Sequence, residues 1–202
     1  MGCNIVLMNC LLNHTRFILV FLFISWSLNA QVALPTFHGV HASVDKPAEN
    51  PLQSSGLSTD YTDFNWNYLM GYRFTPQVNG KITQLGGYFN GTKTVYLWQR
   101  SNGSFLGSVS VVANNNWVYA DITTVAVTAG TEYVVAVAVN SSGGSRNNFS
   151  GDNLPNTYGN ITINYTCYKS GTFNSTTYPS SWDIETRADY NWGRADITFV
   201  PY

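Results

Sequence analysis

Charged side chains are scarce in this chain of 202 residues, since only 10% of its residues are Asp, Glu, Lys or Arg. Ten basic residues stand against eleven acidic ones, so the formal net charge is −1. Nucleic-acid binding depends on clustered Lys and Arg side chains that neutralise phosphates, and the sequence contains no such cluster. We therefore expect no nucleic acid among the partners of this protein.

Residues that favour helices are also scarce. After residue 30 the chain has only four Lys, three Glu and eight Leu, whereas Asn, Gly, Ser, Thr, Val and Tyr are abundant. The first group favours helices, and the second favours strands and tight turns. The composition therefore predicts an all-β protein, and the length suits one domain.

Only one long apolar run is present, and it lies near the N-terminus. Residues 17–28 read FILVFLFISWSL and are followed by Asn29 and Ala30. A membrane-spanning helix needs about 20 apolar residues, so this run fits a secretory signal better, with a buried core helix as the alternative. We expect residues 1–30 to be a signal peptide, cleaved after Ala30 or alternatively after Ala42. The mature protein would then be extracellular or periplasmic, with no membrane span.

Cysteine is nearly absent from the expected mature chain. Cleavage after Ala30 leaves Cys167 alone, which excludes an intrachain disulfide. An exported chain without disulfides is more typical of bacteria than of small eukaryotic domains. Because no His lies near Cys167 in the sequence, we expect a packed or inert thiol rather than a catalytic one.

Short apolar runs separated by turn residues make up most of the chain. Asn-Gly pairs at 79–80, 90–91 and 102–103 favour the type I′ turns of β-hairpins. Residues 131–139 (TEYVVAVAV) are apolar on both faces, which predicts a central strand buried on both sides. The pattern predicts a two-sheet antiparallel β-sandwich over residues 61–202. The expected strands lie near residues 68–75, 81–89, 93–99, 104–112, 116–122, 131–139, 160–166 and 195–200.

Three stretches break this strand pattern. Residues 31–60 contain Pro35, Pro47 and Pro51, so we expect a linker or a strap along the edge of the sandwich. Residues 140–159 and 169–194 are long polar loops, and loops of that length are usually binding loops or mobile segments.

Aromatic residues alternate with aliphatic ones in two of the expected strands. Sugar rings stack their C–H faces on flat aromatic side chains, so an aromatic sheet face could bind a neutral carbohydrate. Cross-strand packing without a ligand is the alternative. The candidate ligand-binding residues are Tyr88, Tyr96, Trp98, Trp117 and Tyr119. A second candidate rim consists of Trp66, Tyr178, Trp182, Tyr190 and Trp192.

Polar loop residues suggest a metal site. Asp60, Asp63 and Asp152 lie among amide and carbonyl oxygens of the kind that calcium prefers, and ordinary turn chemistry is the alternative. A structural calcium ion is therefore possible, and we expect no other cofactor.

Catalytic motifs are missing from the sequence. It contains no Gly-x-Ser-x-Gly, His-Glu-x-x-His or phosphate-binding loop. Asp183 and Glu185 would share one face of a strand, and glycoside hydrolysis uses a pair of carboxylates, although a solvated loop pair has the same spacing. We expect no enzymatic activity, with a glycoside hydrolase as an alternative.

Sequence blocks spread over residues 66–199 are similar to those of a known family. The blocks are 70–76 (MGYRFTP), 80–85 (GKITQL), 97–98, 116–118, 125–135 (VAVTAGTEYVV) and 190–199 (YNWGRADITF). They resemble a bacterial domain-of-unknown-function family numbered 4082. The resemblance implies a jelly-roll-like β-sandwich of secreted and cell-surface proteins, often attached to carbohydrate-active or adhesive modules, and it carries over no catalytic residues.

The sequence thus predicts a secreted, non-catalytic binding or adhesion module. Extracellular polysaccharide or a cell-surface component is the leading partner class. A structural or protein-interaction module without a small ligand is the alternative from a different class.

Overall fold

A computed structural model describes residues 46–56, 67–140, 146–148, 154–188 and 190–202, all within one compact unit of the chain, residues 44–202. The expected signal peptide, residues 1–30, lies outside the described residues. So do the candidate metal ligands Asp60, Asp63 and Asp152.

About two thirds of the described residues are in strands and only four are in a helix, which confirms the predicted all-β class. The helix α2 (Pro51–Ser54) is a single turn of four residues. The strands are β1 (Asn67–Pro76), β2 (Gly80–Gln99), β3 (Phe105–Val127), β4 (Tyr133–Asn140), β5 (Arg146–Asn148), β6 (Asn156–Tyr158), β7 (Ile161–Ser170), β8 (Ile184–Arg187), β9 (Tyr190–Trp192) and β10 (Ala195–Pro201).

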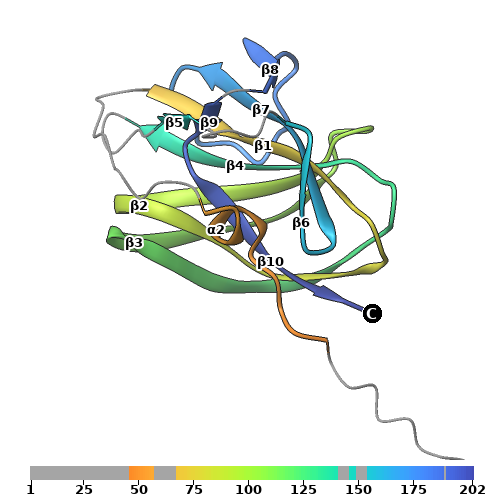
Figure 1. Cartoon of the computed structure of the whole chain (residues 1–202). Coiled ribbons are helices and arrows are strands. Elements are labelled where there is room, and N and C mark those ends of the chain that lie inside the picture. The colour runs from red at the N-terminus through yellow and green to blue at the C-terminus, as the bar shows by residue number, and fades with distance from the viewer. Residues whose placement is uncertain (1–45, 57–66, 141–145, 149–153, 189) are drawn as a thin grey trace, which may run out of the picture. The chain divides into compact units, whose positions relative to one another are not determined.

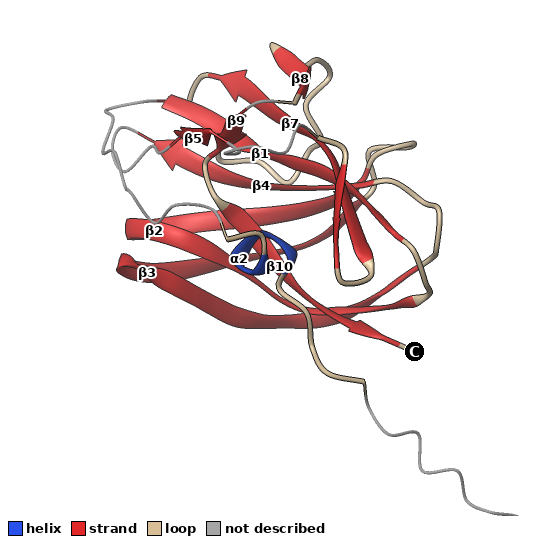
Figure 2. Ribbon diagram, in the orientation of Figure 1, coloured by secondary structure: helices blue, strands red, loops and turns tan. Residues whose placement is uncertain are grey.

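Eight of these strands form one open antiparallel sheet. The strand order is β10-β2-β4-β1-β7-β6, with β3 beside β2 and β8 beside β7, while β5 and β9 form a separate pair. Figures 1 and 2 show the sheet folded over, with β1, β4 and β7 in one layer and β10 in the other. The two layers of the sandwich therefore belong to one continuous sheet.

The fold-over is made by the two longest strands, β2 and β3. They pair from Gly80 opposite Val127 to Trp98 opposite Phe105, with a register shift after Phe89. Residues 80–87 of β2 pair with β10, and residues 94–99 pair with β4. The pair β2–β3, called the β2–β3 ribbon below, therefore runs through both layers.

The Asn-Gly pairs have different structural roles. Asn90 and Gly91 do not close a hairpin, so the prediction of separate strands on either side of them is wrong. The ladder with β3 continues through this pair, where Gly91 has a φ of 77° and the ribbon bends. The pair at 102–103 does lie in the hairpin loop between β2 and β3, with Gly103 at a φ of 67°.

The strand β4 is the predicted central strand. It lies between β1 and β2 and is buried from residue 133 to residue 139. Its odd-numbered side chains enter the main core, and its even-numbered side chains enter a second core on the opposite face. The apolar character of both faces in the sequence therefore reflects two separate packing layers.

The segment before α2 lies between two edges of the sheet. The main chain of Glu49 exchanges hydrogen bonds of 2.7 and 2.8 Å with Phe199 of the edge strand β10. The carboxylate of Glu49 accepts a hydrogen bond of 2.7 Å from the backbone N–H of Asn160, in the turn between β6 and β7. Leu52 of α2 is fully buried in the main core.

Candidate functional site

The five aromatic residues predicted to bind a ligand form two groups. Tyr96 and Trp98 lie on the part of β2 that pairs with β4. Tyr88 lies on the other part of β2, where Trp117 and Tyr119 of β3 stand opposite. Because the ribbon bends between these parts, the five residues do not share one surface.

Tyr96 and Trp98 belong to the second core. Their rings stack with centroids 5.3 Å apart, and Trp98 is fully buried. The loop between β7 and β8 covers them, with Phe173 and Tyr178 packed edge-on against Trp98 at 6.0 and 5.9 Å. The indole N–H of Trp98 donates a hydrogen bond of 2.8 Å to the carbonyl of Thr176. This burial corrects the prediction that these two rings form an exposed platform, since the chain's own loop occupies that face.

Tyr88, Trp117 and Tyr119 are half-buried and remain together. Trp117 contacts Tyr88 edge-on at 5.7 Å and lies parallel to Tyr119 at 6.3 Å. The guanidinium of Arg194 lies 4.8 Å from the centre of the Tyr88 ring. The hydroxyl of Tyr119 donates a hydrogen bond of 2.9 Å to the buried carboxylate of Asp196. Contacts within the domain therefore hold each of these rings.

An open groove of about 660 Å³ lies elsewhere, between the β2–β3 hairpin loop and the β7–β8 loop. It is lined by Arg100, Ser101, Asn102, Gly103, Phe105, Thr176, Thr177, Tyr178, Pro179 and Ser180. Tyr178 is the one lining residue that the sequence had singled out. The sequence predicts Asn102 and Gly103 only as a turn. In the structure this turn and the exposed Phe105 beside it form one side of the groove.

The aromatic groups of the groove are Phe105 and Tyr178. Phe105 is 42% exposed, and Tyr178 is half-buried against the second core. The indole N–H of Trp182 donates a hydrogen bond of 3.0 Å to the hydroxyl of Tyr178. A Cβ atom at Gly103 would come within 3.1 Å of the Tyr178 side chain, so glycine lets the hairpin loop lie close to the ring. Burial raises the pKa of Tyr178, which keeps its hydroxyl protonated.

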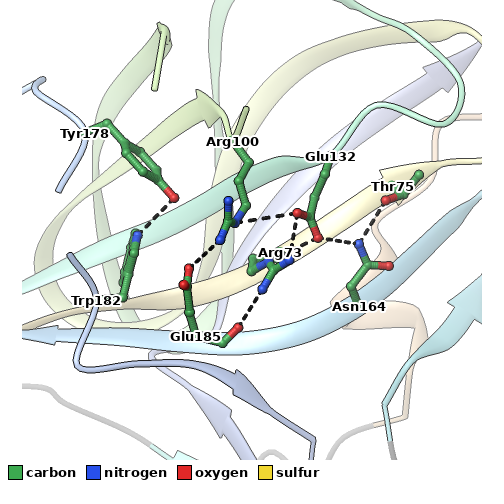
Figure 3. Close-up of polar contacts among 8 residues, drawn as sticks. All are labelled: Arg73, Thr75, Arg100, Glu132, Asn164, Tyr178, Trp182 and Glu185. Atoms are coloured by element: carbon green, nitrogen blue, oxygen red, sulfur yellow. Dashed lines mark hydrogen bonds and ion pairs between the residues drawn. The ribbon is translucent and has the colours of Figure 1, made fainter. Parts of the chain in front are cut away.

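Ion pairs fix the guanidinium of Arg100 beside the groove (Figure 3). Arg100 donates from Nη2 to Glu185 at 2.8 Å. Behind it, Arg73 makes a two-pronged contact with Glu132, with distances of 3.0 and 2.8 Å. Asn164 donates to the same carboxylate at 2.8 Å. The positive charges of Arg73 and Arg100 are therefore balanced by the negative charges of two glutamates, Glu132 and Glu185. These ion pairs hold the polar side of the groove in place.

Asp183 and Glu185 each have a cationic partner of their own. Asp183 accepts hydrogen bonds from Lys169 at 3.0 Å and from the backbone of Ser170 at 2.7 Å. Hydrogen bonds from Ser170 and Lys169 lower the pKa of Asp183 to about 2. A glycosidase acid needs a raised pKa, so this environment shifts the Asp183 carboxyl in the opposite direction.

The other predicted residues are placed as follows. Cys167 packs in the second core, and burial raises the pKa of its thiol. Trp192 is half-buried, 5.1 Å from the ring of Tyr168. Trp66 and the side chain of Tyr190 lie outside the described part of the chain.

No group of three or more His, Cys, Asp or Glu side chains in this part of the chain could hold a metal ion. Likewise, none of the described helices is both long and apolar enough to cross a membrane.

These observations define an all-β domain with one folded antiparallel sheet and a groove between a hairpin and a covering loop. The chain belongs to the family described as Domain of unknown function (DUF4082), which matches residues 59–190. The match confirms the resemblance noted in the sequence, although the block at 191–199 lies beyond it. No curated protein matches the chain.

Proposed function

We propose that this chain is a secreted, non-catalytic module that binds extracellular carbohydrate in the groove between the β2–β3 and β7–β8 loops. The observation that carries the proposal is the presence of Phe105 and Tyr178 in the same open groove as amide, hydroxyl and guanidinium groups. Binding sites for small ligands typically combine apolar and aromatic walls with a few placed polar groups.

The chemistry of the groove suits sugar rings. The exposed ring of Phe105 offers a flat face for the C–H groups of a pyranose. Asn102, Ser101 and Thr177 supply neutral donors and acceptors that could bind sugar hydroxyl groups. Because Arg100 is paired with Glu185, its charge is balanced within the site, which favours a neutral ligand.

The open form of the groove favours a chain rather than an enclosed monosaccharide. Its lining residues come from two loops, and several of them are exposed, including Asn102, Thr176 and Ser180. An open groove of this kind can take a segment of a longer polysaccharide chain. Secretion, which the proposal requires, rests on the apolar run at residues 17–28.

The test is a binding survey with soluble polysaccharides and a glycan array, followed by titration calorimetry of any ligand found. Phe105→Ala and Asn102→Ala should each weaken binding about tenfold or more, since each removes a central contact. Tyr178→Phe should weaken binding less, because it keeps the ring that packs on Trp98.

Val112→Ala is the matched control. Val112 is an exposed apolar residue of the same strand, and it does not line the groove. The control should bind like the wild type. Absence of binding to any carbohydrate would overturn the proposal, as would wild-type affinity in Phe105→Ala and Asn102→Ala.

A further inference from the structure

The three Asn-Gly pairs of the chain, at residues 79–80, 90–91 and 102–103, share a chemical property as well as a turn preference. An asparagine followed by glycine can lose its side-chain amide, because the backbone nitrogen of the glycine can attack the amide carbon. Glycine has no side chain to shield that nitrogen. The attack requires that the two atoms can approach each other, so the local structure decides which pair reacts.

The first two pairs are held by the sheet. Gly80 is buried at the start of β2, between β10 and β3. The amide oxygen of Asn79 accepts a hydrogen bond of 2.9 Å from the backbone N–H of Ala129, which ties this side chain to the turn before β4. Asn90 and Gly91 lie inside the β2–β3 ladder, opposite residues 114 and 113. Strand pairing therefore restrains the backbone at both glycines.

The third pair lies outside the strands, in the hairpin loop between β2 and β3. Asn102 is exposed, and its amide oxygen accepts a hydrogen bond of 2.9 Å from the backbone N–H of Ser104. This contact folds the side chain over the peptide that follows it, which contains the nitrogen of Gly103. Among the described residues, no backbone acceptor receives a hydrogen bond from the N–H of Gly103. The attacking nitrogen is thus close to the amide and is not held by a strand.

We propose that Asn102 is a site of spontaneous deamidation, and that it reacts faster than Asn79 and Asn90. The nitrogen of Gly103 gives its proton to a solvent base and forms a bond to Cγ of Asn102. The bond from Cγ to Nδ2 breaks, and the amide leaves as ammonia with a proton from water. The product is a five-membered succinimide ring. Water then opens the ring at either carbonyl, which leaves aspartate or isoaspartate at position 102, and no oxidant or reductant is needed.

The hydrogen bond from Ser104 assists the first step. Negative charge develops on the amide oxygen of Asn102 as the nitrogen adds to Cγ. A backbone N–H at 2.9 Å already points at that oxygen, which is the distance at which donors stabilise such charges. The loop therefore supplies both a free nucleophile and a donor for the developing oxyanion.

The modification would change the groove. Asn102 lines it together with Phe105 and Tyr178, and the reaction replaces a neutral amide with a carboxylate. Isoaspartate also lengthens the backbone by one carbon atom, in a loop that Gly103 keeps close to the Tyr178 ring. The groove would gain a negative charge and a different wall. The reaction itself does not depend on carbohydrate binding, so the two proposals can fail separately.

Peptide mapping by mass spectrometry tests the inference on the folded protein, incubated at neutral and at mildly alkaline pH. The amide of Asn102 should be lost about tenfold or more faster than those of Asn79 and Asn90. Labelling with an isoaspartyl methyltransferase should detect isoaspartate at position 102. Loss should be faster at alkaline pH, because base removes the proton of the attacking nitrogen. The same protein unfolded in urea is the control, and there the three rates should become similar.

Two variants test the route of the reaction. Gly103→Ala should slow the loss in both the folded and the unfolded protein, because its methyl group shields the nitrogen, so a disturbed loop cannot account for the result. Ser104→Ala keeps the backbone N–H and should react like the wild type. Equal rates at the three asparagines of the folded protein would overturn the inference. So would an Asn102 amide that persists in the folded protein while the unfolded chain loses it, or a wild-type rate in Gly103→Ala.

Discussion

The carboxylate of Asp196 on β10 accepts a hydrogen bond of 2.8 Å from the hydroxyl of Tyr72 on β1, a strand that is not its neighbour in the sheet. The same carboxylate accepts hydrogen bonds from the backbone N–H groups of Leu52 and Gln53 at 3.1 and 3.0 Å, and from the hydroxyl of Tyr119. One fully buried group therefore connects α2, β1, β3 and β10. Its burial raises the pKa of Asp196 to about 6, although these hydrogen bonds oppose the shift.

Asp196→Asn should change how stability depends on pH. A native pKa near 6 lies above the unfolded value of about 4, so the native state binds this proton more tightly. The contribution of Asp196 to the free energy of unfolding is therefore fully present below about pH 4. It is lost as the pH rises through 6. The unfolding free energy of the wild type minus that of Asp196→Asn should fall over this range, by about 1.4 kcal/mol per unit of pKa difference.

Urea unfolding of both proteins at several pH values between 4 and 7 measures this difference. Asp196→Asn itself should lower stability at every pH, because the amide replaces one acceptor oxygen with a donor that faces other donors. A difference that rises with pH would mean that the hydrogen bonds outweigh burial and that the native pKa lies below 4.

Trp98→Ala should destabilise the domain by about 3–5 kcal/mol, the usual cost of removing a large buried aromatic side chain. Trp98 is fully buried and contacts Tyr96, Phe173 and Tyr178, so its loss opens a cavity beneath the β7–β8 loop. Trp98→Phe keeps a ring but loses the hydrogen bond to Thr176, and it should cost less. Chemical denaturation measures both, and a loss under about 1 kcal/mol for Trp98→Ala would contradict the burial of this face.

Gly71→Ala should disrupt the sheet, whereas Gly130→Ala should not. A Cβ atom at Gly71 in β1 would lie 1.9 Å from the carbonyl oxygen of Val135 and 2.6 Å from the Cα of Ala136, both backbone atoms of β4. At Gly130, with a φ of 76°, nothing lies within 4 Å, so only backbone strain of about 1 kcal/mol is expected. Thermal unfolding distinguishes the two, and equal melting temperatures would refute the close approach at Gly71.

Glu132→Gln should cost about 1.5–3 kcal/mol, the range for hydrogen bonds to charged groups. Its carboxylate binds Arg73 twice and Asn164 once, in a half-buried position. Asp183→Asn removes the more exposed contact with Lys169, and exposed ion pairs contribute under about 1 kcal/mol. Urea unfolding at two salt concentrations compares the stability losses of the two variants. If both lose the same unfolding free energy and salt reduces both losses, Glu132 behaves as a surface charge.

The sequence predicted the fold class and the central strand, because both depend on local pattern. The alternation of apolar residues located β1, β4, β7 and β10, and the double apolar face of 133–139 indicated burial on both sides. The bend of the β2–β3 ribbon could not be predicted in the same way. Asn90 and Gly91 favour a hairpin locally. In the fold they lie within one strand instead, because β2 pairs with both β10 and β4.

The site was harder to predict for a related reason. Tyr96 and Trp98 alternate as an exposed sheet face would, and the sequence does not indicate that Phe173 and Tyr178, about 75 residues later, cover them. The groove depends on the same long-range contact, since its two walls meet only after the β7–β8 loop has packed on the sheet. Local pattern identifies aromatic residues, and the tertiary fold decides which of them face solvent.

The pairing of β2 with both β4 and β10 also sets the order in which the chain can fold. Residues 94–99 find β4 about forty residues later, but residues 80–87 must wait for β10, at residues 195–201. The layer with β1, β4 and β7 can therefore assemble first, while residues 80–87 gain their β10 partner only after more than a hundred further residues have been made. Pairings between such distant segments are slow to form. A nascent chain of this protein would thus stay incompletely folded until the strand β10 is available.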